Sequence, residues 1–186
     1  MNHADHVALL RNGAPTFEGI WADLGAGSGA FTLALADLLD GNGQIIAVDK
    51  DRSALAENQR QMTNRFPKAR VEYRAADFTR DLDLPPLDGV VMANSLHFHR
   101  HKAPILDRVR AMLKPGGRLI LVEYNVDHGN MWVPHPLSFE TWKALSEQHG
   151  FTETRLLHVY PSRFLHEIYS AGSIIGSNGA PDNMGK

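Results

Sequence analysis

Short apolar segments alternate with segments of helical periodicity along most of this chain of 186 residues. The segments of strand character are 20–24, 44–48, 69–75, 88–93 and 118–124. Those of helical character are 30–39, 53–66, 105–113 and 138–149. Residues 44–48, QIIAV, are apolar and β-branched almost throughout, which is typical of a strand covered on both faces. Such alternation predicts right-handed crossovers and a mainly parallel sheet with helices on both faces.

Two further strand segments, 151–160 and 164–174, follow one another around Pro161 and Ser162. Consecutive strands with a short connection form an antiparallel hairpin. We therefore expect an α/β fold: a Rossmann-like, doubly wound sheet of seven strands, mostly parallel, with an antiparallel C-terminal hairpin strand. The length predicts a single domain over residues 1–174, and the polar residues 175–186, rich in Gly and Pro, are predicted to form a mobile tail.

Composition limits the classes of function. Lys and Arg total 19 against 21 Asp and Glu, so the net charge of -2 argues against a nucleic-acid-binding protein. The absence of Cys excludes disulfides, thiolate metal sites and a Cys nucleophile. No apolar run is long enough to span a bilayer, and the first residues do not read as a secretory signal. We expect a cytoplasmic protein with neither nucleic acid nor membrane as partner.

A glycine-rich loop, DLGAGSGA at residues 23–30, joins the first strand segment to the first helical segment. Its spacing fits both the dinucleotide pattern G-x-G-x-x-G/A and the pattern G-x-G-x-G after an acid. Asp49 follows the glycine loop at the distance of about 20 residues that is typical of a ribose-binding acid. The carboxylate of Asp23 is an unfavourable neighbour for a pyrophosphate at a helix N-terminus. It suits the ammonium and sulfonium groups of S-adenosyl-L-methionine.

Five segments carry a resemblance to a known family: ADLGAGSGAFTLALA, IIAVDKD, RAADF, DGVVMANSLHFH and LKPGGRLILVEY. In this order they resemble the successive motifs of class I S-adenosylmethionine-dependent methyltransferases, over roughly residues 17 to 174. The LKPGG turn before an apolar strand is the most specific of these motifs. Within the family, the chain is most similar to the small-molecule group typified by quinone-biosynthesis methyltransferases.

The resemblance implies a set of residues that bind S-adenosyl-L-methionine. The methionine and ribose part would meet the glycines, with Asp23 near the amino group, Asp49 at the ribose hydroxyls and Asn94 beside the methionine tail. The adenine would meet Asp77 and its two neighbours. Lys50 departs from the family pattern, which has an apolar side chain there, although its aliphatic stem can take that place. The acids are also explained as loop or helix caps. The full set is Asp23, Gly25, Gly27, Gly29, Asp49, Lys50, Ala76, Asp77, Phe78 and Asn94.

His97 comes directly after the fourth strand segment, where the sheet edge should border the cleft. Together with His99 and His101 it suggests a metal site, but further ligands are not evident, and we expect no metal. Imidazole takes up a proton near neutral pH. We therefore expect His97 to be the catalytic residue, as a general base or by orienting the acceptor. Simple packing at the strand end is the alternative.

The expected reaction is direct displacement of a methyl group from the sulfonium to a small-molecule acceptor. The N-terminal segment is short, so we expect either an open cleft or one covered by the loop of residues 125–137 or by a second subunit of a homodimer. A binding module without turnover remains an alternative. A nicotinamide-dependent reductase is a weaker one, because the sequence lacks a Tyr-x-x-x-Lys proton donor.

Overall fold

The computed structural model describes residues 1–162 and 164–176. In chain order its elements are α1 (His3–Arg11), β1 (Gly19–Leu24), α2 (Ala30–Leu39), β2 (Gly43–Asp49), α3 (Arg52–Arg65), β3 (Arg70–Ala75), β4 (Leu87–Ala93), the 3-10 helix η1 (Leu96–Phe98), α4 (Ala103–Met112), β5 (Leu113–Tyr124), α5 (Phe139–Gln148), β6 (Phe151–Pro161) and β7 (Glu167–Ile175).

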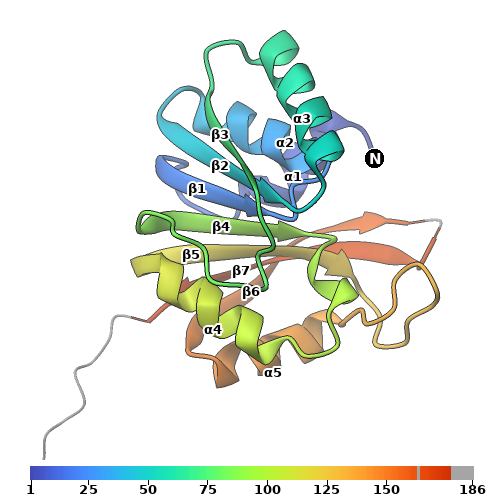
Figure 1. The fold of residues 1–186 in the computed structure, drawn as a ribbon. Helices are drawn as coiled ribbons and strands as arrows, with labels where there is room; N and C mark the ends of the chain where they lie inside the picture. The colour runs from blue at the N-terminus through green and yellow to red at the C-terminus, as the bar shows by residue number, and fades with distance from the viewer. Residues whose placement is uncertain (163, 177–186) are drawn as a thin grey trace, which may run out of the picture.

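The seven strands form one sheet in the order β3-β2-β1-β4-β5-β7-β6. The pairs from β3 to β5 are parallel, and β7 is antiparallel to both β5 and β6. This arrangement confirms the predicted fold class, including the antiparallel C-terminal hairpin. The chain runs outward from β1 to β3 and then returns to place β4 on the other side of β1 (Figure 1). Ligands bind at such a reversal, beyond the carboxyl ends of the strands.

Helices cover both faces of the sheet, as the alternation predicted (Figure 1). One apolar layer joins α1, α2 and α3 to the sheet and includes Leu10, Leu35 and Trp21. The other joins α4 and α5 to the opposite face and includes Leu106 and Trp142. Because the central strands are buried on both faces, the strand ends are held rigidly, and the loops that follow them have fixed starting points.

The structure differs from the sequence prediction at the N-terminus. Helix α1 was not predicted, although Asn2 and Asp5 form a capping box in which each side chain accepts a hydrogen bond from the other residue's backbone N–H. The segment 76–86 between β3 and β4 contains no helix, and the sequence predicted none there. Pro85 and Pro86 lack the N–H groups that a helix requires.

The C-terminal boundary also differs slightly. Strand β7 extends to Ile175, one residue beyond the predicted end of the domain. Residues 177–186 of the predicted tail lie outside the described residues.

Gly89 of β4 allows the indole of Trp21 to lie directly on the sheet. A Cβ at position 89 would lie 2.4 Å from ring atoms of Trp21, which is 2% exposed and has no room to move. We expect Gly89→Ala to lower the free energy of unfolding by about 1–3 kcal/mol, as overpacking of a core does. Denaturant unfolding measures the loss. Gly176→Ala, where a Cβ meets only ordinary contacts, is the control; equal midpoints for both variants would contradict this packing.

Candidate active site

A cavity of about 220 Å³ lies at the carboxyl ends of β1, β2 and β4. Glycine-loop, acidic and aromatic residues line it: Gly25, Asp49, Lys50, Ala76, Asp77, Phe78, Asn94, Ser95, Phe98 and His99. An adjoining hollow of about 220 Å³ is lined by residues that include Asp23, Gly27 and Ser28, and it shares Gly25 and Asn94 with the first. The structure therefore brings together most of the residues predicted to bind the cofactor. Gly29 and His97 line neither hollow.

The glycine loop is shaped by hydrogen bonds to β2 and by backbone conformations that favour glycine. The N–H of Gly25 donates to the carbonyl of Val48 at 2.9 Å, and the N–H of Gly27 donates to Asp49 Oδ2 at 2.8 Å. Gly25 has φ +83°, and a Cβ there would lie 2.5 Å from the Cβ of Ser95. A Cβ on Gly27 would meet nothing within 4 Å. A ligand can therefore approach the loop backbone closely at this position.

Gly29 has a different role from the other loop glycines. It has φ +101° at the N-terminus of α2, and a Cβ there would lie 2.5 Å from Asn58 Oδ1. Gly29 therefore permits the turn into α2 and the packing of α3, but it does not line the cavity.

Asp23 is a buried carboxyl group at the carboxyl-terminal part of β1, with 1% exposure. Thr32 Oγ1 donates to Asp23 Oδ2 at 2.6 Å, and Asn58 Nδ2 in turn donates to Thr32 Oγ1 at 2.8 Å. Burial raises the pKa of Asp23 to about 7; the charge of Asp49 adds to this, and the Thr32 hydrogen bond opposes it. A cationic ligand in the adjoining hollow would favour the ionised form.

Asn94 carries an unpartnered polar atom into the site. It has φ +51°, a left-handed conformation that Asn tolerates better than most residues, and its N–H donates to the carbonyl of Val122 at 2.9 Å. Its Oδ1 is buried and has no hydrogen-bond partner among the described residues. Because Asn94 lines both hollows, a bound donor group can satisfy this oxygen.

Asp77 and Phe78 form the far side of the cavity. Asp77 Oδ1 accepts hydrogen bonds from the N–H and the hydroxyl of Thr79 at 2.9 Å and 2.7 Å, which lower the pKa of Asp77. The ring of Phe78 lies edge-on to His99, with centroids 5.3 Å apart. Lys50 lines the cavity beside these two residues. A planar ligand can therefore contact aromatic and aliphatic surface here while its polar edge faces a carboxylate.

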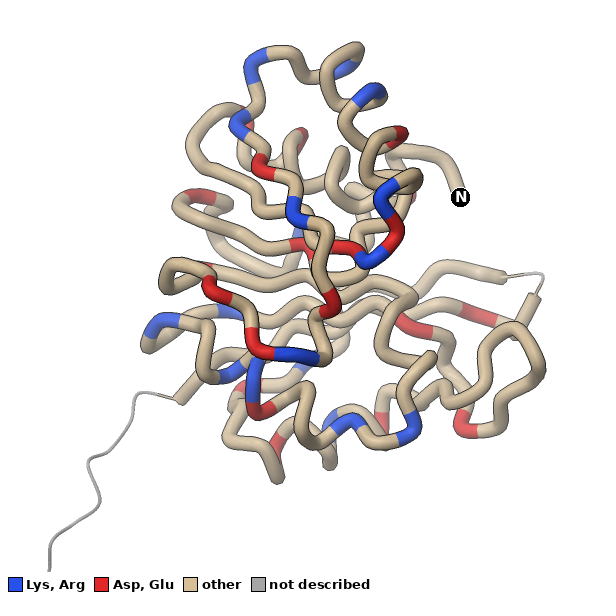
Figure 2. The backbone as a smooth tube through the Cα atoms, in the orientation of Figure 1, with Lys and Arg blue, Asp and Glu red and all other residues tan. Residues whose placement is uncertain are grey.

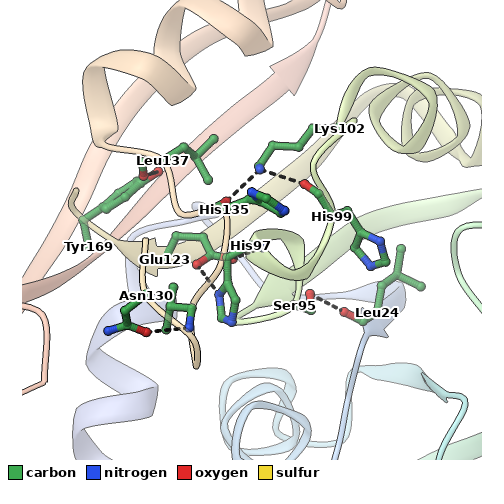
Figure 3. A network of polar contacts seen from close by, with 11 residues as sticks. Leu24, Ser95, His97, His99, Lys102, Glu123, Asn130, His135, Leu137 and Tyr169 are labelled. Carbon is green, nitrogen blue, oxygen red and sulfur yellow. Dashed lines mark hydrogen bonds and ion pairs between the residues drawn. The ribbon is translucent and has the colours of Figure 1, made fainter. Parts of the chain in front are cut away.

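His97 forms a buried pair with Glu123 at the end of β5 (Figure 3). His97 Nδ1 lies 2.8 Å from Glu123 Oε2, and the His97 N–H donates to Glu123 Oε1 at 3.0 Å. Their side chains are 4% and 0% exposed. The His97 ring also lies beside those of Phe98 and Tyr124, with centroids 4.3 Å and 6.1 Å away. Among the described residues, Nε2 forms no hydrogen bond.

Sequence reasoning placed no partner opposite His97. One signal for Glu123 was present, because it is a charged residue in the otherwise apolar run LILVEY. A carboxylate is almost never buried in a strand unless it is paired.

The loop of residues 125–137 lies beside the segment that carries His97. The N–H of His135 donates to the carbonyl of His97 at 3.0 Å. Lys102 Nζ donates to the carbonyls of His99 and His135 at 2.9 Å and 2.8 Å (Figure 3). Near the loop tip, Trp132 is 69% exposed.

The described residues contain no cluster of three or more His, Cys, Asp or Glu side chains arranged to hold a metal ion. None of their helices is long and apolar enough to cross a membrane. A larger hollow of about 680 Å³ is lined by Arg11, Arg118 and Arg155. This hollow lies beside Arg118 of β5 and Ile174 near the end of β7. It is therefore away from the strand ends that hold the glycine loop.

Comparison with known proteins identifies the family. The model of a methyltransferase domain matches residues 22–119. Acetylserotonin O-methyltransferase of Mus musculus is 36% identical over 159 residues, which are 72% of this chain and 39% of the mouse protein. A ubiquinone/menaquinone biosynthesis C-methyltransferase of Pseudomonas savastanoi is 30% identical over 105 residues, covering 55% of this chain and 41% of the relative. The chain thus spans less than half the length of these relatives.

A solved structure supports the same fold. A S-adenosylmethionine-dependent methyltransferase from Aquifex aeolicus superimposes with a TM-score of 0.72 at 18% identity. The match covers 92% of this chain and 89% of that one.

The raised pKa of Asp23 predicts how stability depends on pH without ligand. The folded protein holds a proton up to about pH 7, whereas the unfolded chain releases it near the ordinary value of 3.8. Stability from this group is therefore lost as the pH rises between these values. Asp23→Asn cannot ionise, so the variant should gain about 2 kcal/mol relative to the wild type between about pH 5.5 and about pH 7.5.

Urea unfolding of both proteins at the two pH values measures this difference. Asp83→Asn, which changes an exposed acid of the 76–86 connection, is the control for general charge effects. Parallel pH dependence in the wild type and Asp23→Asn would contradict a buried, protonated Asp23.

Proposed function

Because the chain belongs to the class I S-adenosylmethionine-dependent methyltransferases, we propose that it methylates a small-molecule acceptor by direct displacement, with His97 as the base. The observation that carries this proposal is the buried pair of His97 and Glu123, because the chain neighbours of His97, namely Ser95, Phe98 and His99, line the cavity at the strand ends. When bound, S-adenosylmethionine supplies a methyl group on a positively charged sulfur, from which a nucleophile can displace it. The protein then has to align the two reactants and exclude water.

The residues of the two hollows fit this cofactor. The buried, unpartnered Oδ1 of Asn94 and the carboxyl group of Asp23 suit the donors of the methionine end. The open backbone at Gly27, together with Gly25, suits close approach of the chain to the ligand. These contacts would bring the sulfonium to the strand ends of β1 and β4, with positive charge facing carboxylates.

Asp49 is suited to hold the ribose hydroxyls. Its carboxylate accepts the N–H groups of Gly27 and Asp51 at 2.8 Å and 2.9 Å. A carboxylate offers about four lone-pair sites, so it retains capacity for two hydroxyl donors. The same two bonds fix the orientation of the carboxylate before the ligand arrives. The adenine would lie between Lys50, Ala76 and Phe78, with Asp77 at its amino edge.

Glu123 prepares His97 to act as a base. When Nδ1–H donates to Glu123 Oε2, the neutral ring carries its lone pair on Nε2. Glu123 Oε1 accepts the backbone N–H of the same residue, so both ring and backbone are fixed. After Nε2 takes the proton of the acceptor, the carboxylate stabilises the imidazolium that results.

A small acceptor suits the charges and the surface near His97. Lys and Arg are interspersed with Asp and Glu along the chain (Figure 2), which offers little to a polyanion. The aromatic rings of Phe98 and Tyr124 lie beside the base, and Phe164 packs on Tyr124 with ring centroids 5.9 Å apart. The two relatives described above are named for methylation at oxygen and at carbon. We therefore infer an apolar, flat acceptor that is methylated at an oxygen or an acidic carbon.

Calorimetry tests the cofactor part of this proposal. The protein should bind S-adenosylmethionine and S-adenosylhomocysteine but not NADH. Asp49→Ala should weaken the binding of both by about 1.5–3 kcal/mol, since a charge-assisted hydrogen bond is lost. Asp81→Ala, which removes an exposed acid from the 76–86 connection, is the control. Wild-type affinity in Asp49→Ala would remove Asp49 from the site, and NADH binding would contradict the cofactor assignment.

Turnover tests the role of His97. Radiolabelled S-adenosylmethionine is offered with phenols, quinols, thiols and activated methylene compounds, and the best acceptor is used for kinetics. His97→Ala should lower turnover by roughly 10²–10⁴-fold while cofactor affinity stays within about twofold. His101→Ala, at an exposed histidine, is the control. Melting temperatures of both variants show how much protein is folded.

Full turnover per folded His97→Ala molecule would exclude His97 as the base. Tight, salt-dependent binding of tRNA to the wild type would contradict the small-molecule acceptor.

A further inference from the structure

We propose that Lys102 is a positioning residue that clamps the loop of residues 125–137 to the segment carrying His97, and thereby fixes the acceptor side of the site. The effect on catalysis rests on the proposed function, whereas the clamp itself does not. The juxtaposition that carries the inference is one ammonium group between two backbone carbonyls, His99 on its own segment and His135 on the loop (Figure 3).

The environment of the Lys102 ammonium is unusual for this chain. Among the described residues Lys102 forms no ion pair, whereas Lys114 Nζ lies 2.8 Å from both carboxylate oxygens of Asp88. The Lys102 side chain is partly buried, and this burial lowers the pKa of Lys102, with the charge of Glu123 acting in the opposite direction. Burying an ammonium without a carboxylate partner is costly unless its donors are satisfied. Here the two carbonyls accept two of its three N–H donors, so those bonds hold the side chain in one place.

The loop is joined to the His97 segment through one residue. The N–H of His135 donates to the carbonyl of His97, and the carbonyl of His135 accepts from Lys102. The loop's other side-chain bonds lie elsewhere: Asn125 contacts Glu167 and Phe139, Asp127 contacts Ser138, and Asn130 bonds within its own turn. Lys102 therefore supplies one of the two hydrogen bonds through which the loop and the His97 segment are linked across the described residues.

Two roles of Lys102 can be separated on the structure. As the N-cap of α4, its backbone carbonyl accepts the N–H groups of Ile105 and Leu106, and its side chain takes no part in the cap. A substitution that keeps the backbone and the length of the side chain therefore removes the clamp and leaves the start of α4 intact. Loss of the clamp should free the loop that carries Met131 and Trp132, which are 87% and 69% exposed.

Hydrogen exchange and kinetics on the full chain test the clamp. Lys102→Met removes the donors and keeps an unbranched side chain, Lys102→Arg restores donors, and Lys143→Met removes an exposed cation of α5 as a control. In Lys102→Met, amides of residues 128–137 should exchange about tenfold faster or more, while those of β4 and β5 are unchanged. The KM for the acceptor should rise and kcat should fall, with cofactor affinity within about twofold. Lys102→Arg should recover part of each loss.

Each outcome decides the proposal. Unchanged loop exchange in Lys102→Met would overturn the clamp, and faster exchange throughout the sheet would replace it with a general packing role. Faster loop exchange with unaltered acceptor kinetics would overturn the positioning role. If His97→Ala keeps full turnover while Lys102→Met loosens the loop and raises the KM, the assignment of the base fails and the clamp stands.

Discussion

The site depends on one topological constraint, the reversal of strand order between β1 and β4. Parallel strands deliver their carboxyl ends to the same edge of the sheet, and the reversal sends the following segments to opposite sides. The glycine loop after β1 and η1 after β4 therefore diverge and leave room between them, the cavity lined by Gly25 of the loop and Phe98 of η1. Asp49 at the end of β2 and Asn94 after β4 border this room without any movement of the sheet.

Two buried carboxyl groups, Asp23 and Glu123, interrupt strands that are otherwise apolar at the same edge. Each is held by a different kind of donor. Asp23 accepts a hydrogen bond from the neutral hydroxyl of Thr32, and burial raises the pKa of Asp23 to about 7. Glu123 instead accepts the backbone N–H of His97 and pairs with its ring nitrogen Nδ1. At this edge, Asp23 can therefore ionise when a cationic ligand binds, whereas the position of Glu123 is fixed by its contacts with His97.

How much could be predicted from the sequence depended on the range of the interactions. Buried strands such as 44–48 have a local signature, and their alternation with helices led to the sheet. The family resemblance then predicted that residues such as Asp49 and Asp77 bind the cofactor, and the structure brings both to one cavity. Helix α1 was missed because its apolar face is short and its capping box was not recognised. The pairing of His97 with Glu123 joins residues that are far apart in the chain, and only the register of β4 and β5 brings them together.

Strand β7, the last strand in the sequence, lies between β5 and β6 and is antiparallel to both, which has a consequence for folding during synthesis. Strand β5 carries Glu123, and its outer edge pairs with β7, from Arg118 opposite Ile174 to Tyr124 opposite Ile168. A nascent chain emerging from the ribosome exposes this edge until residues near 175 have been synthesised. Contacts of such large sequence separation form late and slowly. The glycine loop can therefore form on a partial sheet, whereas strand β5, which carries Glu123, is paired on its outer edge only when β7 has been added.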